Sequence, residues 1–285
     1  MSSSLDNIKK REGGLSRQLT SRQLGMIALG GAIGTGLFLG SKFAISFAGP
    51  SVIISYVIGG LIALLLMGAL SEMTVAHATT GSFGAFAEHY ISPFAGFMIK
   101  YLYWSCIVLA VGTEVTAVGD YMQMWFPSVP PIVWVLGFSA LLIGVNMFNV
   151  KAFGTLEYWF SATKVFAIVG FIVVAAALVF GGSNPDFGMQ NYNADGGFFL
   201  GGAKGVWFAV IVAIFSYLSI EMIAVAAGEA KEPEVAVKKA FKVTLLRLFL
   251  FYILTLSLIL AIAPVGKILE GGSPFVTVMQ VIGIP

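Results

Sequence analysis

Runs of apolar residues long enough to cross a lipid bilayer fill most of this sequence, and they constrain its fold more than any other feature. A membrane-spanning helix needs about 20 predominantly apolar residues. Hydrophobic residues make up 58% of the chain and charged residues 11%, a balance that soluble domains do not have. The sequence therefore predicts an all-α polytopic membrane protein with seven spans, at residues 26–48, 51–76, 95–124, 131–150, 155–181, 204–227 and 240–263.

The distribution of Lys and Arg predicts how the spans are oriented, because basic residues gather on the cytoplasmic side of a membrane. They cluster before the first span and after the sixth, with two more near loops on the same side: Lys9, Lys10, Arg11, Arg17, Arg22, Lys231, Lys238, Lys239, Lys242, Arg247, Lys100 and Lys151. The other side has only Lys42, Lys204 and Lys267. We therefore expect a multi-pass protein of the cytoplasmic (inner) membrane, with a cytoplasmic tail at residues 1–24 and an extracellular loop at residues 182–203.

The side chains that carry most enzyme and metal chemistry are scarce. A single cysteine, Cys106, excludes an internal disulfide framework, and two histidines without further clustered ligands argue against a transition-metal site. The sequence has no P-loop, nucleophile elbow or dinucleotide-binding fingerprint. A net charge of +2 is too small to indicate a nucleic-acid partner. We expect no enzyme activity, no cofactor and no metal.

Four glycines in the seven residues Gly30–Gly36 interrupt the middle of the first span. Glycine four residues apart, as in Gly30 and Gly34, also lets two helices approach closely, and this packing role is the alternative interpretation. Packing does not require so dense a cluster around Thr35, so we favour a broken helix. Exposed backbone groups at bilayer depth are tolerated only where protein or a cavity satisfies them, which makes this segment a candidate ligand site.

A second irregular segment, Phe215–Glu221, lies in the sixth span and contains two serines, a tyrosine and an acid. Because it comes five spans later, the two segments cross the membrane in opposite directions. Paired broken helices of this kind are typical of alternating-access transporters with a site at the membrane midplane. N–H groups freed around Ile33–Gly36 would suit a carboxylate, and carbonyls freed around Phe215–Leu218 would suit an ammonium. Together they predict an α-amino acid ligand.

Two ordered motifs carry a resemblance to a known family. Gly31–Phe38 (GAIGTGLF) follows the basic N-terminus, and Gly228–Pro233 (GEAKEP) follows the sixth span. They resemble the signatures of amino acid permeases of the amino acid-polyamine-organocation superfamily. The resemblance implies a leucine-transporter-like fold of two inverted five-helix repeats with twelve spans in all. Residues 25–181 would form the first repeat and residues 204–285 an unfinished second one, so we expect the activity to belong to a longer parent protein.

The resemblance also implies which residues bind substrate. Ile33, Gly34, Thr35 and Gly36 would hold its carboxylate, while Phe215, Ser216 and Leu218, through backbone carbonyls, would surround its amine. The Phe215 ring would also cover the substrate as a gate. The alternative for Phe215 is a packed or lipid-facing aromatic ring.

Three ionisable residues lie inside predicted spans, where charge is costly and commonly functional. Lys164 is predicted to carry the coupling proton, and the alternative is a fixed cation bonded to backbone carbonyls. Glu114 is predicted to face the cavity and take part in proton transfer or substrate recognition. For Glu221 we favour a structural role, capping the N–H groups of the second half-helix.

These features predict a secondary transporter that imports an amino acid together with a proton. Obligate exchange of an amino acid for a related amine is one alternative. A seven-span receptor or sensor is another, although the glycine break has no role in such a bundle.

Overall fold

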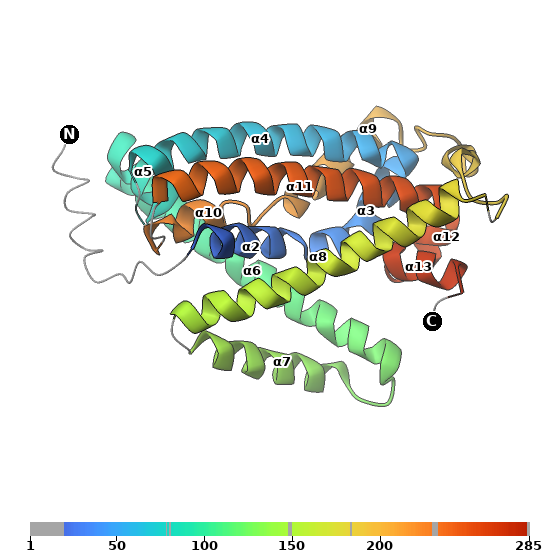
Figure 1. Cartoon of the computed structure of the whole chain (residues 1–285), viewed down its shortest axis with the longest axis horizontal. Helices are drawn as coiled ribbons and strands as arrows, with labels where there is room; N and C mark the ends of the chain where they lie inside the picture. The colour runs from blue at the N-terminus through green and yellow to red at the C-terminus, as the bar shows by residue number, and fades with distance from the viewer. Residues whose placement is uncertain are drawn as a thin grey trace. The chain divides into compact units, whose positions relative to one another are not determined.

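Helices joined by turns and by one longer loop, between α8 and α9, make up this computed structural model (Figure 1), which describes residues 20–77, 79, 81–147, 150–182, 184–229 and 233–283. Most of the predicted cytoplasmic tail (residues 1–19) and residues 230–232 of the second motif lie outside the described residues. The α-helices are α2 (Ser21–Ala32), α3 (Ser41–Ala48), α4 (Val52–Ala76), α5 (Ser82–Tyr90), α6 (Pro93–Trp125), α7 (Pro131–Asn146), α8 (Val150–Phe180), α9 (Gly202–Ser216), α10 (Met222–Val225), α11 (Pro233–Ile262), α12 (Val265–Glu270) and α13 (Pro274–Val281). A π-helix, η1 (Gly36–Gly40), and three 3₁₀ segments complete them: η2 (Gly49–Ser51), η3 (Met189–Asn193) and η4 (Ala226–Glu229).

The helices confirm the predicted all-α membrane architecture. Within the described residues, four stretches are long and apolar enough to cross a bilayer, at Gln23–Ala76, Pro93–Trp125, Thr155–Phe180 and Thr244–Ile262. Two shorter apolar helices are α7 and α9. The first stretch contains two predicted spans, because the chain turns at η2, where Gly49 has a φ of 60°. Every predicted span overlaps one of these helical segments, although α9 ends at Ser216 within the predicted sixth span.

The described chain forms two compact units. The first unit contains residues up to Ile27, Leu70–Tyr158 and Glu221–Ala240, and the second contains Ala28–Ala69, Trp159–Ile220 and the chain from Phe241 onward. Helices α2, α4, α8 and α11 have residues in both units.

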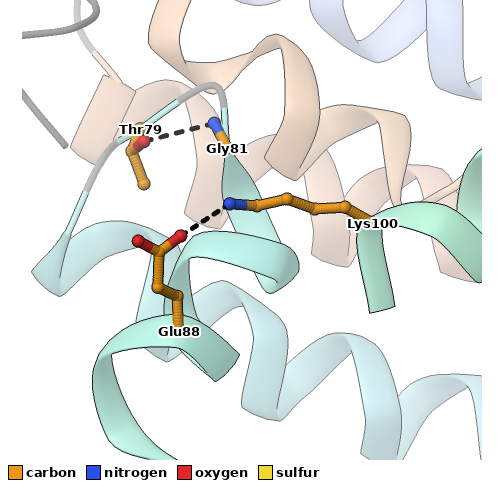
Figure 2. A network of polar contacts seen from close by, with 4 residues as sticks. All are labelled: Thr79, Gly81, Glu88 and Lys100. Carbon is orange, nitrogen blue, oxygen red and sulfur yellow. Dashed lines mark hydrogen bonds and ion pairs between the residues drawn. The ribbon is translucent and has the colours of Figure 1, made fainter. Parts of the chain in front are cut away.

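In the first unit, α6 packs against α5 on one side and α7 on the other. The α6–α7 hairpin is green in Figure 1. Helix α6 begins where Ser92 caps it, its side chain accepting a 3.1 Å hydrogen bond from the Ala95 N–H, with Pro93 in the first turn. An ion pair of 2.7 Å between Lys100 Nζ and Glu88 Oε2 joins α6 to α5 (Figure 2). The nearby turn is fastened by the Gly81 N–H, which donates to Thr79 Oγ1.

In the second unit, α3 and α9 lie in close contact. Two glycines make this possible, because a Cβ at Gly201 or Gly205 would overlap the main-chain oxygen of Phe47 at the end of α3. The spacing of these glycines is the small-xxx-small pattern that brings helix backbones together in membranes. The two half-helices α3 and α9 are therefore held against each other by backbone contact.

Helices α12 and α13 are fastened to the segment that contains η1 and α3. Ser273 Oγ donates a 2.6 Å hydrogen bond to the carbonyl of Phe38, and Lys42 Nζ donates to the carbonyl of Gly271. The rings of Phe38 and Phe275 pack with centroids 4.7 Å apart. The loop between α8 and α9, which contains η3, is attached to α11 by a similar hydrogen bond. Tyr192 Oη donates to the Ser257 carbonyl at 2.7 Å.

The α3–α9 contact leads to a stability prediction. We expect Gly205→Ala to lower the free energy of unfolding by about 1–3 kcal/mol, because the added Cβ must displace one helix backbone. The matched control is Gly170→Ala in α8, where a Cβ would meet nothing within 4 Å. That change should leave stability equal or slightly higher, since alanine favours a helix over glycine. Thermal unfolding of the purified variants in detergent measures both, and equal melting temperatures would contradict the contact.

Candidate functional site

The first predicted helix break is present at Ile33 and Gly34, which are not helical. Helix α2 ends at Ala32, and the Gly34 N–H bends back to the Ala32 carbonyl at 3.1 Å. In a continuous helix that N–H would instead bond to Gly30 four residues earlier. The break therefore deprives the Gly30 carbonyl of its helical partner. The helix resumes at Thr35, so the first N–H groups of a new half-helix lie within the predicted carboxylate segment.

The resumed helix opens as a π-helix, which the sequence did not indicate. Leu37 and Phe38 both donate to the Gly34 carbonyl at 3.1 Å, and η1 then continues into α3. Single π turns are rare and often lie at functional sites, because they widen a helix and redirect its backbone groups.

The second predicted break is also present, between α9 and α10. Helix α9 ends at Ser216, and residues 217–221 form turns before α10 begins. Ser219 has a φ of 80°, a left-handed conformation that is costly for a residue other than glycine. Among the described residues, none donates a main-chain hydrogen bond to the carbonyls of Tyr217 and Leu218.

The two breaks meet within the second unit. Ser216 Oγ donates a 3.0 Å hydrogen bond to the Gly36 carbonyl. A Cβ added at Gly36 would lie 3.0 Å from Ser216 Cα, and one added at Gly31 would lie 2.8 Å from Ser219 Cβ. The glycine cluster therefore combines a helix break with close helix packing. Gly31 and Gly36 allow the broken segments to touch, and Gly34 provides the break itself.

The predicted substrate residues differ in burial. Ile33, Thr35, Gly36 and Ser216 are buried, and Gly34 is half-buried. The Phe215 side chain is 41% exposed and that of Leu218 is 37% exposed. Phe215 Cδ1 would lie 3.4 Å from a Cβ at Gly36, so its ring borders the first break. Gating and packing stay open as roles for this ring.

Lys164 reaches the first break from α8. Its Nζ donates a 2.8 Å hydrogen bond to the carbonyl of Gly30, the same group that the break deprives of its helical partner. One turn earlier, the buried Ser161 packs where a Gly30 side chain would be. A charge-assisted hydrogen bond satisfies a backbone group that would otherwise be costly to bury.

The two predicted acidic residues lie in the first unit. Glu114 is on α6 and is exposed. The capping role predicted for Glu221 is wrong, because its carboxylate makes no capping hydrogen bond. The backbone at Glu221 is right-handed helical (φ −60°, ψ −19°), whereas a capping residue needs an extended conformation. Glu221 Oε1 instead accepts a 3.2 Å hydrogen bond from Tyr103 Oη.

Sequence reasoning assigned no role to the tyrosines around the breaks. Tyr56, Tyr217 and Tyr252 are almost fully buried and come from three different predicted spans. Tyr252 Oη lies 2.7 Å from the Ala32 carbonyl and also bonds to the Ser216 carbonyl. The available signal was the phenol itself, because a hydroxyl in the middle of an apolar helix must find a partner.

Comparison with known proteins identifies the family. The sequence profile of the amino acid permease family matches residues 23–285. The uncharacterized amino acid permease YtnA of Bacillus subtilis (strain 168) is 40% identical over 281 residues, which cover 98% of this chain and 61% of YtnA. Amino-acid permease RocC of the same strain is 42% identical over 278 residues, covering 95% and 59%. The aromatic amino acid transport protein AroP of Escherichia coli (strain K12) is 40% identical over 270 residues, covering 94% and 59%.

The chain thus spans about 60% of the length of these curated relatives. The relatives are named as permeases and transport proteins, so this is a family of transporters and not of enzymes. The match over nearly the whole chain also confirms the family resemblance of the two motifs. This multi-pass membrane chain therefore belongs to the amino acid permease family.

Proposed function

We propose that the protein containing this chain imports an α-amino acid across the cytoplasmic membrane by alternating access. The contact between Ser216 and Gly36 carries the proposal, because it joins the two broken helices within one unit. The N-terminal end of the resumed half-helix, with its partial positive charge, would receive the substrate carboxylate at Ile33–Gly36. The carbonyls around Phe215–Leu218 would receive the ammonium. Ser216 lies between the two.

The relatives support the class of substrate. AroP is named for aromatic amino acids, which carry both charged groups that the two helix ends would recognise. In this arrangement, main-chain groups of the protein would bind the carboxylate and the ammonium of the substrate. Side-chain selectivity would therefore come from other parts of the pocket.

The proposed topology places the N-terminus in the cytoplasm and residues 182–203 outside the cell, as the basic residues predict. Residues 25–181 would be the first inverted repeat and residues 204–285 the beginning of the second. The two breaks would then be equivalent positions of antiparallel repeats, which is the usual place for a transporter site.

Proton coupling through Lys164 is part of the proposal. The Lys164 ammonium holds the Gly30 carbonyl beside the proposed carboxylate segment. Losing the charge would weaken this charge-assisted hydrogen bond, so proton binding and the geometry of the break would be linked. Glu114, on α6, is the second candidate in proton transfer.

Obligate exchange is the second candidate function. The hydrogen bond between Lys164 and the Gly30 carbonyl favours it as well. If Lys164 is a permanent cation that satisfies the Gly30 carbonyl, no proton needs to move during transport. Uptake would then require an internal amino acid as counter-substrate.

The proposed recognition predicts that both charged ends of the substrate are needed. In proteoliposomes containing the chain, alone or joined to the part of AroP that it does not cover, L-phenylalanine should be taken up. Phenethylamine, which lacks the carboxylate, and 3-phenylpropionate, which lacks the amine, should each compete at least about tenfold less well than unlabelled L-phenylalanine. Each of these two compounds lacks one of the charged groups, so the protein backbone groups that would bind it are left without a partner. Equal competition by either compound would contradict the two-ended site.

The coupling role of Lys164 is tested by Lys164→Arg, which keeps the charge and the hydrogen-bonding ability but does not release a proton. We expect accumulation driven by a pH gradient to be lost, while exchange of internal for external substrate persists. Lys100→Gln, which removes a surface ion pair with Glu88, is the control and should retain both activities. Normal pH-driven accumulation by Lys164→Arg would instead identify Lys164 as a fixed cation.

A further inference from the structure

The hydroxyl of Tyr252 lies between the two helix breaks. Tyr252 is on α11 and its side chain is completely buried. Its Oη bonds to the carbonyl of Ala32, the last residue of α2, and to the carbonyl of Ser216, the last residue of α9. The last carbonyls of a helix have no partner in their own helix. One phenol on a third helix therefore serves one end carbonyl from each broken helix.

A second tie joins α9 to η1, on the other side of the first break. Ser216 Oγ lies 3.0 Å from the Gly36 carbonyl and 3.1 Å from the Val212 carbonyl one turn earlier, and Tyr56 Oη lies 3.0 Å from Ser216 Oγ. A hydroxyl has one proton, so when Ser216 donates to Gly36, the Tyr56 hydroxyl must be the donor to Ser216. Ala32 and Gly36 flank residues 33–35 on either side. Both flanking residues are thus linked to Ser216, Ala32 through Tyr252 and Gly36 directly.

We propose that Tyr252 is a positioning residue that holds the two breaks at a fixed separation. This rests on the proposed function, in which one break receives a carboxylate and the other an ammonium. The Tyr252 ring touches neither charged group in this scheme. Its hydroxyl instead sets how far apart the donors at residues 33–36 and the acceptors at residues 215–218 lie.

The hydrogen count makes this tie releasable. The two carbonyls are acceptors only, and the phenol has a single proton to share between them. When one broken helix moves away, the proton can remain with the other carbonyl, so Tyr252 keeps a partner in either arrangement. A tie with a donor for each carbonyl would hold both helices more firmly.

Amide hydrogen exchange of the full chain in detergent, read by mass spectrometry, tests the proposal without a ligand. In Tyr252→Phe, amides in peptides covering residues 30–38 and 213–222 should exchange at least about tenfold faster, because two buried carbonyls lose their shared donor. The control is Tyr192→Phe, which removes the same kind of hydrogen bond, from a tyrosine hydroxyl to a main-chain carbonyl, at Ser257 of α11. It should leave both peptides unchanged. Unchanged exchange in Tyr252→Phe, or a rise spread evenly over all peptides, would overturn the proposal.

A second variant covers the case in which Tyr252→Phe does not fold. Incorporating para-aminophenylalanine at position 252 supplies two N–H protons, one for each carbonyl. Exchange in the same two peptides should then be slower than in the unmodified chain, whereas equal or faster exchange would contradict the shared-proton arrangement.

L-Phenylalanine uptake separates this inference from the proposed function. Tyr252→Phe should raise KM about tenfold with kcat changed less than twofold, and Tyr192→Phe should alter neither. An unchanged KM in Tyr252→Phe would overturn the positioning role. If the unmodified protein takes up no L-phenylalanine, or any other amino acid in a screen, while the exchange results are as expected, the proposed function fails and the structural role of Tyr252 stands.

Discussion

The arrangement of the second unit depends on one constraint: a backbone group freed inside a membrane must find another partner. Breaking α2 at Gly34 and α9 at Ser216 frees several carbonyls at once. Two side chains from two other helices satisfy them, with Lys164 on Gly30 and Tyr252 on both Ala32 and Ser216, and the Ser216 hydroxyl adds a bond to the Gly36 carbonyl of η1. Specific hydrogen bonds, as well as apolar contacts, therefore determine how α8, α9 and α11 pack around the breaks.

Much of this could be predicted from the sequence. The apolar runs gave the helical spans because bilayer thickness leaves little choice of length. The density of glycine located the first break, and the polar residues of the sixth span located the second. Lys164 was recognised as important because a charge in an apolar helix needs a specific partner.

Other features depended on contacts between residues far apart in the chain. That Ser161 would pack on Gly30, or that Tyr252 would reach Ala32, requires knowing which helix faces lie together. The error at Glu221 has a local cause, since residue type suggested a cap but the backbone conformation there is helical. The π-helix η1 could not be predicted from the sequence, because the residue types of Gly36–Gly40 are equally compatible with an α-helical turn.

The backbone contact between α3 and α9 has a consequence for substrate selection. Helix α3 continues the half-helix that would present donors to a carboxylate, and α9 ends in the carbonyls that would receive an ammonium. Because Gly201 and Gly205 let the start of α9 lie directly against Phe47 at the end of α3, the two helices are in backbone contact at their ends away from the breaks. On the proposed function, this contact and the Tyr252 bonds at the opposite ends together set the spacing between the charged ends of a ligand, while the rest of the pocket contacts its side chain.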